Sequence, residues 1–196
     1  MSKIRPRLAR IAMSLVQRVR ICWYAALSTN RVVGAPVLNQ PMQVAGDGKI
    51  SFGADVCIGA FPSPGFLDSY AYIEARHVDA SVVIGSGVWI NNGFRCIAEH
   101  SSITIGRNCL LGTNVEIIDS DFHGLCLLDR RLSKPESAMP VVLEDNVFVG
   151  SNARILKGAR IGAGSVIANS SVVIGDIPPM VVAAGVPARV IRAISG

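Results

Sequence analysis

The sequence contains no acidic residue before Asp47. Seven basic residues fall in the first 46 positions, whereas the rest of the chain holds 12 basic and 14 acidic side chains. A main body with a slight negative charge gives no basis for nucleic-acid binding, so no nucleic-acid partner is expected. The positive charge is confined to the N-terminal residues Lys3, Arg5, Arg7, Arg10, Arg18, Arg20 and Arg31.

Aromatic residues are scarce, with six Phe, two Trp and three Tyr against 19 glycines and abundant Val and Ile. This composition predicts a β-rich chain with many tight corners rather than a helical bundle. The five cysteines are scattered through apolar runs and form no C-x-x-C pair. They indicate core residues in a reducing compartment, and no metal site is expected.

The N-terminal region lacks an apolar run of membrane-spanning length. Its longest run, Ile21 to Leu27, is far shorter than the roughly 20 residues that a spanning helix needs. Arg18 and Arg20 split this region, whereas a signal peptide requires an unbroken apolar segment after its basic start. A cytoplasmic location is therefore expected.

Residues 3 to 27 carry apolar side chains at alternating steps of three and four, which an α-helix brings onto one face. This face could pack on the body of the protein or on a neighbouring subunit. Alternatively, residues 1–30 could lie on an anionic membrane surface, where each nearby basic side chain contributes about 1 kcal/mol. The stripe consists of Ile4, Leu8, Ile11, Leu15, Val19, Cys22 and Ala26.

A six-residue repeat governs the C-terminal part of the chain. Each unit has one aliphatic position followed by small or turn-forming residues, which predicts a short strand and a corner. Three units then make one coil of a prism, and stacked coils bury an aliphatic column. After Asp176 two prolines end the repeat, and the terminal stretch predicts a cap over the open end of the stack. The aliphatic positions are Leu143, Val149, Ile155, Ile161, Ile167 and Val173.

The same period appears upstream in shorter pieces whose phase changes. These changes predict insertions at about residues 60–80 and 97–104, and a longer excursion between Ile117 and Leu143, which are 26 residues apart rather than a multiple of six. Connections this long are usually functional or disordered. His123 stands near the start of this excursion.

The hexapeptide units and the ending DIPPMVVAAGVPARVIR resemble the left-handed parallel β-helix acyltransferases. DSDFHG and the segment PVVLEDNVFVGSNARILKGARIGAGSV are similar to the galactoside and maltose acetyltransferases and to the polysaccharide O-acetyltransferases. The resemblance implies an all-β solenoid, a left-handed parallel β-helix with an N-terminal amphipathic helix and a short C-terminal capping element. We expect a basic helical segment over residues 1–35 and a β-helix domain over 36–196, with an excursion loop at about 124–140.

This family resemblance implies an acetyl-coenzyme A-dependent O-acetyltransferase that modifies a sugar hydroxyl, and a homotrimer with active sites between adjacent prisms. Small-sugar enzymes of the family typically begin with an acidic or mixed helical segment. The basic N-terminus therefore favours an acceptor in polysaccharide or lipopolysaccharide biosynthesis at the inner membrane surface. The alternatives are a free sugar of the maltose or galactoside type, or a non-catalytic β-helix scaffold.

His123 aligns with the catalytic histidine of that family. A sugar hydroxyl is a poor nucleophile at neutral pH, and a histidine with an ordinary pKa near 6.5 is largely neutral there and can take its proton. Asp121 would share a side with it if the segment is extended, and could either orient the imidazole or bond the backbone of the turn. By resemblance, the Ser151 N–H and Asn91, or else Asn92, are candidates to stabilise the oxyanion. His77 and His100 are expected to be surface or structural residues, and their sequence spacing does not suit a zinc site on this fold.

Acetyl-coenzyme A is the expected cosubstrate. The resemblance implies that pantetheine lies along the coils and that arginines near the cap meet its phosphates, which guanidinium groups can bind in bidentate fashion. Ile174 and Gly175 stand where many relatives have Thr and Lys, so Lys157 or Arg160 could supply the missing cation. The expected contacts are Ser151, Gly162, Ala163, Asn169, Ser170, Arg189 and Arg192.

Overall fold

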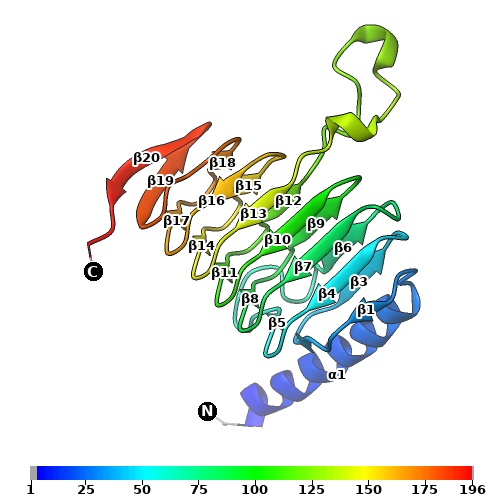
Figure 1. Ribbon diagram of the computed structural model, residues 1–196. Helices are drawn as coiled ribbons and strands as arrows, with labels where there is room; N and C mark the ends of the chain where they lie inside the picture. The colour runs from blue at the N-terminus through cyan, green and yellow to red at the C-terminus, as the bar shows by residue number, and fades with distance from the viewer. Residues whose placement is uncertain (1–3, 196) are drawn as a thin grey trace.

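The computed structural model describes residues 4–195 as one long helix followed by a prism of short strands (Figure 1). Three largely parallel sheets form the sides of the prism, and the chain visits them in the same order on successive coils. The predicted class is confirmed: a left-handed parallel β-helix with an N-terminal helix and a short C-terminal cap. Lys3, one of the basic N-terminal residues, lies outside the described residues.

Each side of the prism is a ladder of strands stacked along its axis. The first side contains β1 (Val32–Val33), β4 (Lys49–Phe52), β7 (Ser81–Ile84), β10 (Ser102–Ile105), β13 (Val141–Leu143) and β16 (Arg160–Ile161). The second contains β2 (Val37–Leu38), β5 (Cys57–Ile58), β8 (Trp89–Ile90), β11 (Leu110–Leu111), β14 (Phe148–Val149) and β17 (Val166–Ile167). The third contains β3 (Met42–Ala45), β6 (Ala71–Ala75), β9 (Arg95–Ala98), β12 (Glu116–Ile118), β15 (Arg154–Ile155) and β18 (Val172–Val173).

The C-terminal cap extends the second side. Strand β19 (Val181–Gly185) pairs in parallel with β17, and β20 (Ala188–Ala193) folds back antiparallel to β19. This hairpin lies at the end of the stack opposite the N-terminal helix (Figure 1). It therefore covers part of the backbone edge that the last coil would otherwise expose.

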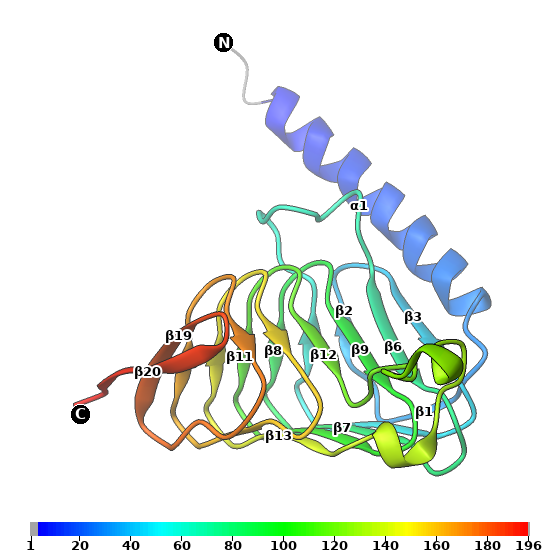
Figure 2. The same ribbon diagram turned by 90° about the horizontal axis from the view of Figure 1, so that it is seen from above.

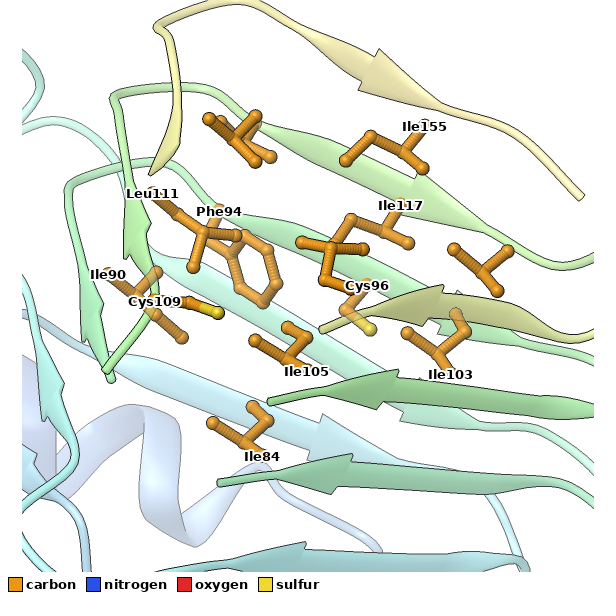
Figure 3. Close-up of a cluster of buried hydrophobic side chains, with 14 of the residues drawn as sticks. Ile84, Ile90, Phe94, Cys96, Ile103, Ile105, Cys109, Leu111, Ile117 and Ile155 are labelled. Atoms are coloured by element: carbon orange, nitrogen blue, oxygen red, sulfur yellow. The ribbon is translucent and has the colours of Figure 1, made fainter. Parts of the chain in front are cut away.

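The interior of the prism is a column of aliphatic side chains (Figure 3). All positions of the predicted repeat from Leu143 to Val173 are buried, with exposed fractions of at most 1%. Ile117 pairs with Ile155 on the next coil, so inward-facing residues stack directly above one another. Phe94 is the largest fully buried side chain and lies among these aliphatic residues. The sequence-based prediction of the core is confirmed for this part of the chain.

Tight corners produce the six-residue period. Strands β14 and β15, for example, have two residues each and are joined by a four-residue corner. Asn146 and Asn152 occupy corners with φ of 61° and 60°, the left-handed region that asparagine enters more readily than most residues. The turn-forming residues of the repeat are therefore needed where the chain changes side.

The upstream insertions differ from the prediction. Residues 71–75 form the regular strand β6, so only the loop over residues 59–70 leaves the prism. The stretch 97–104 is not an insertion, because it holds the end of β9 and most of β10. Strands β6, β7, β9 and β10 have four or five residues rather than two. Longer strands lengthen the period and shift its phase without any excursion.

The N-terminal helix α1 (Ile4–Ala26) runs beside the 59–70 loop (Figure 2). Polar side chains of the helix attach it to this loop. Gln17 is 3% exposed and donates from Nε2 to the carbonyl oxygen of Phe66 at 2.6 Å. Arg20 donates from Nη2 to the carbonyl oxygen of Ser69 at 2.6 Å. The attached face of the helix is therefore partly polar, because it satisfies loop carbonyl groups.

The predicted apolar stripe of α1 faces away from the prism. Leu8, Leu15 and Val19 are 60%, 57% and 70% exposed, and Trp23 is 63% exposed. Packing of this stripe on the body of the same chain, one of the alternatives for this segment, is therefore wrong. No helix within residues 4–195 combines the length and apolarity that crossing a bilayer requires.

Candidate active site on the edges of the prism

The corners of successive coils stack into three edges, and two of them carry most of the predicted site residues. We call the corners that join the third side to the first the histidine edge; they hold His77, His100 and His123. We call the corners that join the second side to the third the asparagine edge; they hold Asn91 and Ser151. The two edges are separated by the full width of the third side.

The long excursion, residues 119–140, leaves the prism at the histidine edge between β12 and β13 (Figure 1). It contains two short 3-10 helices, η1 (Leu127–Asp129) and η2 (Pro135–Ser137). Its base is closed by a hydrogen bond from the Met139 N–H to the Asp119 carbonyl oxygen at 2.8 Å. A second bond, from the Gly124 N–H to the Leu132 carbonyl oxygen at 2.9 Å, closes the neck. The excursion is therefore a defined arm with a fixed base.

His123 lies at the base of this arm, exposed to solvent and lining an open cavity of about 480 Å³. Leu156, Lys157 and Arg130 line the same cavity. The preceding residue, Phe122, has a φ of 59°, which turns the chain sharply just before the histidine. The cavity thus combines an accessible imidazole with basic side chains suited to anionic or hydroxyl-rich ligands.

Asp121 is paired with Lys157 rather than with His123. The Lys157 Nζ lies 2.6 Å from Asp121 Oδ2 and also donates to the Ser137 carbonyl oxygen at 2.9 Å. Among residues 4–195 no hydrogen bond joins Asp121 to His123. Lys157 therefore ties both ends of the excursion to the following coil, and the carboxylate of Asp121 is directed toward that lysine.

Asp119 is a structural residue at the root of the excursion. Its buried carboxylate accepts the N–H of Glu99 at 2.7 Å and the N–H of Ser101 at 2.8 Å. Burial raises the pKa of Asp119, although these backbone hydrogen bonds oppose the shift. The residue connects the histidine-bearing corner to the corner below it.

The two adjacent asparagines on the asparagine edge have different environments. Asn92 is fully buried, and its amide exchanges hydrogen bonds with Ala60, at 3.1 Å to the N–H and 3.0 Å to the carbonyl oxygen, and donates to the Pro64 carbonyl oxygen at 3.0 Å. Its side chain holds the 59–70 loop. Asn91 is half-buried, and its Oδ1 accepts the N–H of Asn92 at 2.8 Å. Of the two, Asn91 is the one whose position leaves it available to a ligand.

Ser151 lies further along the same edge. Its N–H donates to Asn169 Oδ1 at 2.9 Å, and its hydroxyl oxygen accepts the N–H of Thr113 at 3.2 Å. An oxyanion could accept this N–H only after displacing Asn169 Oδ1. Ser170, in the left-handed region with a φ of 60°, donates its N–H to the Ser151 carbonyl oxygen at 2.9 Å.

The other predicted cofactor residues occupy two further places. Gly162 and Ala163 lie on the remaining edge, between the first and second sides, where the Ala163 N–H donates to Glu144 Oε2 at 2.8 Å. Arg189 and Arg192 are exposed on β20 of the cap. A single chain therefore does not bring the candidates for histidine chemistry and for cofactor binding into one pocket.

Both basic residues proposed to replace the missing family lysine already form ion pairs. Lys157 is bound to Asp121, and Arg160 forms an ion pair with Glu144. The proximity of Lys157 to Asp121 was missed at the sequence level, yet the repeat contained the signal. Since Ile117 and Ile155 are stacked, the residues that follow them must lie on adjacent corners of one edge.

His77 and His100 form a separate stacked pair. Their ring centroids are 4.1 Å apart, and His100 Nδ1 lies 3.3 Å from the carboxylate oxygens of Asp79. In the described part of the chain, no group of three or more His, Cys, Asp or Glu residues is arranged to hold a metal ion. The pair packs on the histidine edge below the cavity.

Comparison with known proteins agrees with the repeat and the fold. Residues 140–175 match the family model described as bacterial transferase hexapeptide (six repeats). A putative acetyltransferase of Saccharomyces cerevisiae is 42% identical over 116 residues, which cover 57% of this chain and 58% of the relative. The chain thus spans less than two thirds of the length of this curated relative.

Two solved structures share the fold at 27% sequence identity. A polySia-specific acetyltransferase has a TM-score of 0.57, with 81% of this chain and 66% of that chain covered. A galactoside acetyltransferase in complex with coenzyme A has a TM-score of 0.53, with 82% of this chain and 64% of that chain covered. The repeat, the prism and these relatives agree with one another: residues 140–175 carry the bacterial transferase hexapeptide repeat, and the chain is similar in sequence and fold to acetyltransferases that contain it.

Proposed function

We propose that this protein is an acetyl-coenzyme A-dependent O-acetyltransferase that modifies a sugar hydroxyl, with His123 as the general base. The observation that carries the proposal is the exposed His123 at the base of the excursion, on the cavity of the histidine edge. The solved relatives described above include acetyltransferases named for polySia and for galactosides, one of them with coenzyme A bound.

In the proposed reaction, neutral His123 accepts the proton of the acceptor hydroxyl as that oxygen attacks the acetyl carbonyl carbon. The resulting oxyanion requires hydrogen-bond donors aimed at it. Collapse of the intermediate breaks the carbon–sulfur bond, and the imidazolium returns its proton to the thiolate of coenzyme A. No covalent acetyl-enzyme is needed, so His123 acts only as a proton carrier.

The active site is proposed to lie between two chains of a homotrimer. His123 is on the histidine edge, while Asn91 and Ser151 are on the asparagine edge of the same prism. When prisms stand side by side, the histidine edge of one chain can face the asparagine edge of the next. This arrangement supplies the base and the oxyanion donor from different subunits.

Acetyl-coenzyme A is proposed to run along this cleft toward the cap. Arg189 and Arg192 are exposed on β20, with guanidinium groups that bond only to backbone carbonyl oxygens of Ala188 and Ala193 within the described residues. Such groups can bind phosphate without first breaking an ion pair. Gly162, Ala163, Asn169 and Ser170 remain proposed pantetheine contacts.

Thiol release from acetyl-coenzyme A should depend on a sugar acceptor. The measurement compares free sugars, nucleotide sugars and deacetylated polysaccharide under identical conditions. We expect turnover with an oligosaccharide or polysaccharide acceptor and little with maltose or galactosides. Turnover restricted to free sugars would contradict the polysaccharide assignment, and a folded protein that does not bind coenzyme A would support the scaffold alternative.

The polysaccharide assignment is supported by the exposed face of α1. The stripe containing Leu8, Leu15 and Val19 points away from the prism, and α1 contains no acidic residue. Arg10 and Arg18 are exposed on the same helix. An apolar stripe flanked by arginines suits an anionic lipid surface, where lipid-linked acceptors are found. We propose that α1 places the prism against such a surface.

Vesicle binding tests this role of α1. The triple substitution Leu8→Gln, Leu15→Gln and Val19→Gln should weaken sedimentation with anionic vesicles by about tenfold or more, because burial of each side chain contributes roughly 1.5–3 kcal/mol. Brominated lipids should quench Trp23, which is 63% exposed on this helix. Val78→Gln, at a 79% exposed position on the prism, is the matched control. Unquenched Trp23 with unchanged sedimentation would instead favour burial of the stripe against a second copy.

A further inference from the structure

Two neighbouring coils carry a cluster of charged side chains at the histidine edge, which we call the corner cluster: Glu74 at the end of β6, and Arg76 and Glu99 on the corners. Arg76 Nε lies 2.8 Å from Glu74 Oε1, and its Nη1 lies 3.1 Å from Glu99 Oε1. The side chain of Glu99 is 3% exposed and that of Glu74 is 12% exposed. Since buried carboxylates are costly unless paired, Arg76 is held in one orientation between them.

The corner cluster contacts the excursion at two points. The guanidinium carbon of Arg76 lies 4.8 Å from the centroid of the Phe122 ring, a cation–π arrangement. The hydroxyl of Ser133 donates to Glu99 Oε2 at 2.7 Å. Phe122 immediately precedes His123, and Ser133 lies on the returning limb. The cluster therefore contacts both limbs of the excursion beside the proposed base.

The ionised form of Glu99 stabilises the contact with Ser133. Burial alone would raise its pKa, but hydrogen bonds from Ser120, Ser133 and Arg76 outweigh burial and hold the pKa below its ordinary value. The carboxylate is therefore ionised at neutral pH. An ionised acceptor strengthens the bond from Ser133, because hydrogen bonds to charged groups are stronger than neutral ones.

We infer that Arg76 and Glu99 are positioning residues that fix His123 by anchoring the excursion at Phe122 and Ser133. The anchoring is a property of the loop, and only its catalytic consequence rests on the proposed function. A base must be placed within hydrogen-bond reach of the hydroxyl, and a displacement of about 1 Å can reduce the rate about 10²-fold. Contacts on two limbs restrict the sideways motion of the arm better than contacts on one.

The test breaks the two anchors without unpairing the buried charges. The double variant Phe122→Leu with Ser133→Ala removes the ring and the hydroxyl from the excursion and leaves the ion pairs of the corner cluster intact. We expect kcat to fall at least tenfold while KM for acetyl-coenzyme A stays within twofold. Amide hydrogen exchange over residues 119–140 should become faster, with no change in the strands of the prism.

Rescue and control variants separate positioning from general damage. Phe122→Tyr keeps an aromatic face for Arg76 and should retain kcat within about twofold. Arg107→Gln breaks an exposed ion pair with Asp145, 2.9 Å long, on a different edge and should change neither kcat nor exchange in the excursion. Unchanged kcat in an active double variant, or unchanged exchange over residues 119–140, would overturn the inference. If the wild-type protein turns over no acceptor, the proposed function fails, and the exchange measurement alone decides whether the cluster anchors the excursion.

Discussion

Replacing His123 with alanine should lower kcat for acetyl transfer by about 10²–10⁴-fold, the contribution typical of a general base. The substitution removes the imidazole that takes the hydroxyl proton, and water is a poor substitute at neutral pH. Because His123 is exposed on an arm outside the prism, the change should not alter the fold. The measurement is thiol release at saturating acetyl-coenzyme A with an acceptor that the wild-type protein uses.

Matched variants test whether the loss of activity is specific to His123. His77→Ala removes an exposed imidazole from the same edge and should retain kcat within about twofold. Coenzyme A binding and the molecular mass in solution should be the same for wild type and His123→Ala, since the histidine contacts neither the aliphatic column nor the cap. A His123→Ala protein that transfers acetyl at the wild-type rate would remove this residue as the base and redirect attention to Lys157 and Asp121.

Replacing Phe94 with alanine should lower the free energy of unfolding by about 3–5 kcal/mol, the usual cost of truncating a buried aromatic residue. Phe94 is fully buried among Ile90, Cys96 and Leu111 (Figure 3). The stacked coils are tied together by backbone ladders on three sides, so the surrounding strands can collapse only slightly into the vacated volume. The free-energy cost of the remaining cavity therefore adds to the cost of the lost apolar burial.

Chemical denaturation at fixed protein concentration measures this loss. Phe61→Ala, in the 59–70 loop where Phe61 is 52% exposed and its ring centroid lies 5.2 Å from that of Phe66, should cost about 1 kcal/mol. Equal destabilisation by the two substitutions would mean that the column around Phe94 is not the main source of stability. A smaller loss at Phe94 would show that the coils can repack.

The fold was predictable where strand and corner lengths are constant. From β14 to β18 every strand has two residues, so the sequence period and the structural period agree there. Upstream, four- and five-residue strands such as β6 and β9 shift the phase, and the sequence pattern cannot distinguish a longer strand from an inserted loop. The helix presents a related difficulty. Periodicity identifies residues that share a face of α1 but not what that face meets.

The candidate site was predictable to a smaller extent. The motif around His123 and the length of the excursion point to the same place on the chain, and the structure shows that place to be an accessible cavity. Contacts between distant segments were not predictable from local patterns. The repeat register places Lys157 and Asp121 on adjacent corners, but the hydrogen bonds of the Asn92 side chain depend on how the 59–70 loop folds back onto the prism. The corner cluster likewise combines segments that carry no shared motif.

The stacking of coils makes distance along an edge a discrete quantity. Successive strands are about 4.8 Å apart, so a group on one corner is separated from its counterpart on a later corner by a whole number of such steps. After β12, which leads to His123, the third side has two more strands, β15 and β18, before the cap begins. Adding or deleting a coil here would move the cap arginines relative to the base by about one strand spacing. The number of coils thus acts as a molecular ruler for the length of cosubstrate that the edge can accommodate.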